Sequence, residues 1–149
     1  ETVAEAVAIP VFLSSISQVP LIKIGLKKKQ KILTLVASGK DIDDAFFSSA
    51  GADLSDCVIC EIGALESFSA IRWGRTVLDN QKLEADLVET VKKELSKSSE
   101  IGAVLLECSD LPPYSYAIQQ ASGLPVFDFI SLIKWVYSAV VQTRYYGHF

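Results

Sequence analysis

Residues 101–127, with the sequence IGAVLLECSDLPPYSYAIQQASGLPVF, constrain the fold of this chain more than any other stretch. Ala103 to Leu106 form a continuous apolar run, which is typical of a strand buried on both faces of a parallel sheet. Pro112 and Pro113 lack an N–H and have a fixed φ, so they suit the first turn of a helix. An apolar run that ends at Phe127 follows. The stretch therefore predicts a strand, a loop, a helix and a second strand.

Cys108 lies in the loop that follows the first of these strands. Loops after parallel strands emerge at the carboxyl edge of the sheet, where open α/β sheets bind their ligands. A position just before a helix N-terminus also favours a thiolate, because the helix dipole and the free N–H groups stabilise negative charge. The position predicts that Cys108 acts as a base or nucleophile. The alternative is a cysteine that packs as a small apolar residue.

Two earlier segments show the same buried-strand pattern, Ile32 to Ala37 and Cys57 to Ile62. A helix pattern follows the first of them over residues 42–50, with Asp41 as its expected cap, and amphipathic helices are expected over 83–95 and 130–141. The predicted fold class is therefore α/β, a parallel sheet flanked by helices. Ser38 follows the strand at 32–37, so we expect it at the same sheet edge as Cys108. Residues 9–13 predict a further short strand that starts with a proline.

Composition limits the classes of function. A chain of 149 residues, half of them hydrophobic, can bury the core of one domain. Its net charge of −4 argues against a nucleic-acid partner or an anionic membrane surface, and no apolar run is long enough to span a membrane. Three cysteines are an odd number and form no disulfide framework, which favours a reducing, cytoplasmic setting.

Other chemistry-bearing residues have ordinary explanations. Cys57 and Cys60 have redox or metal spacing, but positions three apart in a strand point to opposite faces, and His148 is the only histidine. We therefore expect neither a metal site nor a redox pair. Arg72 and Arg75 are either ligands for a substrate carboxylate or surface residues beside Trp73. His148 and the run of lysines at 27–29 are expected to be solvated.

The chain also contains an internal repeat. AEAVAIPVFLSSISQVPLIKI near the start matches IQQASGLPVFDFISLIKWVYS near the end, and Pro10 aligns with Pro125 at an offset of 115. The counterpart of Cys108 would then fall at position −7, which lies before residue 1. The sequence also begins at Glu1 and contains no methionine. Both observations predict that a related unit, with a cysteine of its own, precedes residue 1 in the complete protein.

The segment LLECSDLPPYSYAIQQASGLPVFD resembles the second-half signature of the aspartate/glutamate racemase superfamily, with a cysteine loop, a double proline and a Leu-Pro-Val-Phe-Asp strand. The resemblance extends to IPVFLSSISQVPLI and KILTLVAS, and it departs from the family pattern at Ser109 and Asp110. It implies one Rossmann-like or flavodoxin-like half of a two-half, pseudo-symmetric fold. On that pattern residues 1–16 are the remnant of a first half, 17–128 are the second half, and 129–149 form a helix that packs back on the first half.

The resemblance implies a cofactor-independent racemase or isomerase of acidic amino acids, in which two thiols on opposite sides of the substrate remove and return the α-proton. Cys108 would be one of these thiols, and this chain alone would be inactive. The resemblance suggests Ser14, Ser15, Ser38, Ser109 and Asp110 as the residues that bind a small carboxylate substrate, although an ionised Asp110 would repel an acidic one. An assembly of several copies is left open.

Other functions remain open from sequence. Hydantoin racemases, maleate isomerases and arylmalonate decarboxylases share the scaffold, and a non-catalytic ligand-binding or regulatory protein would retain it. A thiol hydrolase is a weaker alternative, because no histidine lies in a motif that would serve Cys108 as a base.

Overall fold

A computed structural model describes residues 2–40, 42–74 and 77–147 of the chain. Its centre is a sheet of four parallel strands in the order β2-β1-β3-β4. The strands are β1 (Lys31–Val36), β2 (Cys57–Glu61), β3 (Ile101–Leu106) and β4 (Val126–Phe127). The two central strands, β1 and β3, carry the continuous apolar runs because both of their faces are covered. The prediction of an α/β fold with a parallel sheet is confirmed.

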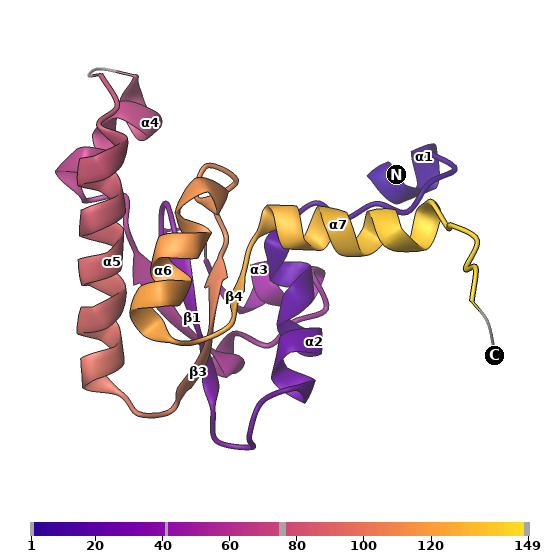
Figure 1. Ribbon diagram of the computed structural model, residues 1–149, viewed down its shortest axis with the longest axis horizontal. Coiled ribbons are helices and arrows are strands. Elements are labelled where there is room, and N and C mark those ends of the chain that lie inside the picture. The colour runs from indigo at the N-terminus through magenta and orange to yellow at the C-terminus, as the bar shows by residue number, and fades with distance from the viewer. Residues whose placement is uncertain (1, 41, 75–76, 148–149) are drawn as a thin grey trace.

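Helices cover both faces of this sheet (Figure 1). On one face α5 (Asn80–Lys97) and α6 (Ser115–Ser122) contribute to an apolar cluster with alternate residues of β1 and β3. On the other face α2 (Val19–Ile24) and α3 (Asp44–Ser49) contribute to a second cluster. The shorter elements are α1 (Val3–Ala6), α4 (Ser69–Trp73) and the 3₁₀ turns η1 (Ser15–Gln18), η2 (Leu54–Asp56), η3 (Glu66–Phe68) and η4 (Pro112–Tyr114).

Two local predictions need correction. Residues 9–13 form no strand, although they carry the same Pro-Val-Phe sequence as β4. The two segments differ in whether a neighbouring strand is available. β4 pairs with β3, whereas residues 9–13 lie along helix α7 (Phe129–Val140). Helix α3 is capped by Asp43, whose Oδ1 accepts a hydrogen bond from the backbone N–H of Phe46 at 2.8 Å. The predicted cap, Asp41, lies outside the described residues.

Helix α7 begins at a capping box and then leaves the sheet. Asp128 accepts a hydrogen bond from the N–H of Ser131 at 2.7 Å, and the Ser131 hydroxyl accepts one from the N–H of Asp128 at 2.8 Å. Figure 1 shows α7 extending past α2, with the N-terminal segment beside its far end. In the described part of the chain no helix is long and apolar enough to cross a membrane. The division at residues 1–16, 17–128 and 129–149 stays a prediction.

Candidate functional site

The carboxyl ends of β1 and β3 lie side by side and form the edge that the sequence predicts as the site. Leu35 pairs with Leu106, and the N–H of Glu107 donates to the carbonyl of Leu35 at 2.9 Å. Ser38 follows the end of β1 by two residues, and Cys108 follows the end of β3 by two residues. The fold therefore places Cys108 and Ser38 at one edge.

Cys108 is half-buried at this edge and packs against the apolar cluster that α5 and α6 cover. Its thiol lies 3.7 Å from Oδ2 of Asp110, and its carbonyl accepts a hydrogen bond from the N–H of Leu111 at 3.1 Å. This bond closes a tight turn that leads directly into η4. The thiol and the carboxylate are thus held together by the local chain geometry.

The surroundings of this thiol oppose the activation that is expected of a helix N-terminus. Burial raises the pKa of the Cys108 thiol, and the negative charges of Asp110 and Glu107 raise it further. Only the backbone hydrogen bond at Asp110 acts in the other direction. The following turn starts with Pro112 and Pro113, which have no N–H to offer a thiolate. In the ligand-free protein the thiol is therefore protonated at neutral pH.

Two carboxylates flank the thiol. Asp110 is exposed, whereas Glu107 is half-buried and burial raises the pKa of its carboxyl group. The sequence patterns above assign Glu107 no role. Its position directly after a buried strand was the available signal, because that position places it at the same edge. The site is acidic, and it suits a ligand that carries positive charge.

The serines have different surroundings. Ser15 is fully buried, and its hydroxyl lies 3.2 Å from the carbonyl oxygens of Leu106 and Glu107, so it ties η1 to the start of the cysteine loop. Ser14 caps η1 by accepting a hydrogen bond from Ile16 N–H at 3.1 Å. Ser38 accepts one from the N–H of Lys40 at 3.4 Å, and Ser109 is exposed beside Cys108. The structure gathers Ser15, Ser38 and Ser109 at the edge, and their binding roles stay predictions.

Cys57 and Cys60 belong to opposite faces of the sheet, as the strand alternation predicts. Burial raises the pKa of each thiol to about 11. Within the ranges that the structure describes, no group of three or more histidine, cysteine, aspartate or glutamate side chains is placed to hold a metal ion. His148 and Arg75 lie outside those ranges. The pair therefore forms neither a redox nor a metal site among the described residues.

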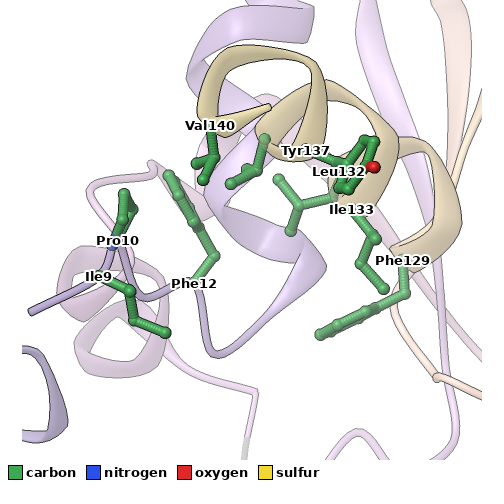
Figure 2. Close-up of a pocket in the computed structure, with 9 residues that line it drawn as sticks. Ile9, Pro10, Phe12, Phe129, Leu132, Ile133, Tyr137 and Val140 are labelled. Carbon is green, nitrogen blue, oxygen red and sulfur yellow. The ribbon is translucent and has the colours of Figure 1, made fainter. Parts of the chain in front are cut away.

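The described surface also has an apolar groove away from Cys108, with a volume of about 330 Å³. Figure 2 shows Ile9, Pro10 and Phe12 of the N-terminal segment facing side chains of α7 across it. The α7 residues that line it are Phe129, Leu132, Ile133, Val136, Tyr137 and Val140. None of the predicted site residues lines this groove, and the Tyr137 hydroxyl is its one ionisable side chain. It offers an apolar contact surface, in which the Tyr137 hydroxyl is the one group that could exchange a proton.

Comparison with known proteins finds relatives that are named as lyases. The chain is 27% identical over 146 residues to dimethylsulfoniopropionate lyase 5 of Emiliania huxleyi (strain CCMP1516) and 31% identical over 147 residues to lyase 7 of the same organism. It is also 29% identical over 143 residues to the dimethylsulfoniopropionate lyase of Durusdinium sp. clade D. Each match covers 93% of this chain.

The chain spans less than half the length of these relatives, since the matches cover 29%, 43% and 47% of their sequences. No protein-family model and no solved structure matches it. The relatives are enzymes, and at that level the prediction of an enzyme is supported.

The prediction of an aspartate/glutamate racemase, and of racemase or isomerase activity, is wrong. Relatives along 93% of the chain are lyases. The resemblance depended on the segment around Cys108 and on two earlier segments, IPVFLSSISQVPLI and KILTLVAS, which together define a parallel sheet with a thiol at its edge. Such an arrangement does not define which bond breaks at the substrate.

Proposed function

We propose that the protein containing this chain is a lyase that cleaves dimethylsulfoniopropionate, with Cys108 as the base. The similarity to lyases of that name over 93% of the chain carries the proposal. The acidic surroundings of Cys108 support it, because this substrate has a sulfonium cation at one end. An acidic amino acid would instead meet the carboxylates of Glu107 and Asp110.

The reaction we propose is a β-elimination. A Cys108 thiolate takes a proton from the carbon beside the substrate carboxylate and becomes a thiol. The electron pair of that C–H bond forms the carbon–carbon double bond. The bond to sulfur breaks, and its electron pair leaves with sulfur. The products are acrylate, neutral dimethyl sulfide and one proton held by Cys108. Elimination returns no proton to the opposite face of the carbon, so one thiol is sufficient for this chemistry.

The raised pKa of Cys108 fits a substrate that activates its own base. Asp110 and Glu107 raise this pKa through their negative charge. A sulfonium cation bound beside them would offset that charge and lower the pKa of the thiol. The thiolate would then form mainly when substrate is bound, which would also protect a reactive cysteine in the empty protein.

The test is the release of dimethyl sulfide by the full-length protein, measured in the gas above the solution. We expect release by the unmodified protein and a loss of at least about a hundredfold in Cys108→Ser, because a hydroxyl is a far weaker acid than a thiol. Ser99→Ala is the control, since it removes an exposed hydroxyl in the turn before β3, at the other end of the strand that leads to Cys108. Release that persists in Cys108→Ser would exclude Cys108 as the base, and no release by the unmodified protein would exclude the lyase.

A further inference from the structure

A cationic side chain, for which the sequence left open a surface position or a role as carboxylate ligand, lies at the carboxyl edge of the sheet that also carries Cys108. Arg72, in helix α4, has its Nη1 3.5 Å from the carbonyl oxygen of Ala37, which directly follows β1. The same nitrogen lies 4.0 Å from Oε1 of Glu61, the last residue of β2. The guanidinium group therefore lies over the carboxyl ends of two neighbouring strands.

A glycine makes this position available. A Cβ atom at Gly63 would lie 2.0 Å from the carbonyl oxygen of Ala37 and 2.2 Å from Nη1 of Arg72. Both distances are far shorter than any non-bonded contact that a Cβ atom makes in a folded protein. Any other residue at position 63 would occupy the space through which Arg72 reaches the sheet edge, so the approach of Arg72 depends on the missing side chain.

The position of Arg72 can be related to Cys108 through the register of the sheet. Leu35 pairs with Leu106 and its carbonyl accepts from the N–H of Glu107, so Ala37 and Cys108 each lie two residues beyond the last paired residues of adjacent strands. Ala37, Cys108 and Ile71 of α4 all pack against the same apolar cluster. Helix α4, through Ile71, and Cys108 therefore lie on the same face of the sheet.

Arg72 has hydrogen-bonding capacity left for a ligand. Both of its polar contacts use Nη1, and among the described residues Nε and Nη2 have no hydrogen-bond partner. The contact with Glu61 is long, and about 45% of the Glu61 side chain is exposed, so this ion pair holds the guanidinium only weakly. The Trp73 ring, 4.9 Å from Cζ, helps to orient it.

From this arrangement we propose that Arg72 binds the carboxylate of the substrate, an inference that rests on the proposed lyase function. A guanidinium group binds a carboxylate through two parallel hydrogen bonds. In dimethylsulfoniopropionate the carbon that loses its proton is bonded directly to the carboxylate carbon, and the sulfonium lies at the other end. Binding the carboxylate at Arg72 would place that carbon beside Cys108 and direct the sulfonium towards the acidic side chains. The substrate and the edge would then be complementary in charge at both ends.

The experiment compares Arg72→Gln, Arg72→Lys and the control Lys92→Gln, which removes one charge from an exposed position on α5. Each full-length protein is assayed for dimethyl sulfide release from dimethylsulfoniopropionate and from its methyl ester, which lacks the carboxylate charge. For the acid, Arg72→Gln should raise KM roughly tenfold to a hundredfold, the range expected for a charge-assisted pair. For the ester it should change KM little. The KM of Arg72→Lys for the acid should lie between those of the unmodified protein and of Arg72→Gln. Lys92→Gln should have the same KM as the unmodified protein.

The readout is the preference for acid over ester, which a purely structural role of Arg72 would leave intact. A preference that is the same in Arg72→Gln and in the unmodified protein would overturn the proposal. Acrylate binding, measured by calorimetry, gives a second readout that needs no turnover. If the unmodified protein binds acrylate and Arg72→Gln does not, Arg72 is a carboxylate ligand even where no dimethyl sulfide is released, so failure of the lyase proposal is distinguishable from failure of this one.

Discussion

At the scale of single residues, the surroundings of each cysteine decide its chemistry. All three thiols in this chain have a raised pKa, and burial is the largest cause for each. Cys108 differs from the other two because the charged neighbours that act on it are all acidic, whereas lysines also act on Cys57 and Cys60, and because it is open enough to meet a ligand. Its reactivity therefore depends on whatever alters the charge around it.

Alkylation by iodoacetamide will show this dependence. Cys108 should react before Cys57 and Cys60, which are only 8% exposed, and its rate should rise steadily above pH 8 because its pKa is raised. Asp110→Asn removes a negative charge that raises this pKa. It should therefore speed labelling at pH 8 by roughly two- to fivefold, since one unit of pKa is tenfold in thiolate. Ser109→Ala is the control variant. If Asp110→Asn were labelled no faster than Ser109→Ala, Asp110 would not be a cause of the raised pKa of Cys108.

Cys57 and Cys60 predict a loss of stability at high pH. Their pKa of about 11 in the folded protein lies above that of a free thiol, roughly 8.5. Between these values the unfolded chain binds fewer protons than the folded one, so the free energy of unfolding falls as pH rises from about 9 to 11. Urea unfolding across this range should show a shallower pH dependence in Cys57→Ala and in Cys60→Ala. Equal slopes in all three proteins would count against buried thiols.

At the scale of elements, sequence predicts the strands best where burial leaves the fewest alternatives. β3 is a continuous apolar run and β1 is one except for Lys31 and the buried Thr34, and a strand covered on both faces suits them. Residues 9–13 resemble β4 in sequence and still form no strand, because pairing needs a neighbour in space and sequence does not show one. Local pattern thus predicts what a segment favours, and tertiary contacts decide the rest.

The site divides in the same way. The position of Cys108 and Ser38 at one edge follows from strand order and could be predicted. The direction of the Cys108 pKa could not, because it depends on burial and on Asp110, which only the folded chain shows. The tie from Ser15 to the cysteine loop joins residues 91 positions apart in sequence, so no local pattern indicates it.

Helix α7 offers a test of element stability at its cap. Asp128 is buried, caps α7 and also accepts a hydrogen bond from Ser115 of α6. Asp128→Ala should lower the free energy of unfolding by about 2 kcal/mol, the upper end of the range for N-caps. Asp43→Ala removes the exposed cap of α3 and should cost about 1 kcal/mol or less. Urea denaturation measures both, and equal costs would show that the buried contact to Ser115 adds nothing.

At the scale of the whole molecule, stability is distributed unevenly. The sheet and the helices on its two faces bury two apolar clusters. Within α7 only Leu132 is buried, whereas Ile133, Trp135, Tyr137 and Val140 are each about half exposed or more. The end of α7 therefore adds little to the core, and we expect it to open without the sheet.

Hydrogen exchange on residues 1–149 will measure this difference. Amides at the end of α7, from Val136 to Val140, should exchange at least about a hundredfold faster than those in β1 and β3, since local opening costs far less than global unfolding. Helix α5 is the control, because Leu83, Leu87 and Val91 bury it against the sheet. Equal protection of α7 and α5 would show that one cooperative unit includes both.

The central place of β1 in the sheet has a consequence for synthesis on the ribosome. β1 pairs with β2 on one side and with β3 on the other, and β3 begins 65 residues after β1 ends. While the chain is being made, β1 and β2 emerge well before β3 can pair. An apolar strand with free backbone groups is then open to other nascent chains. Because of this strand order, the growing polypeptide is protected from aggregation only when residues 101–106 have been synthesised and pair with β1.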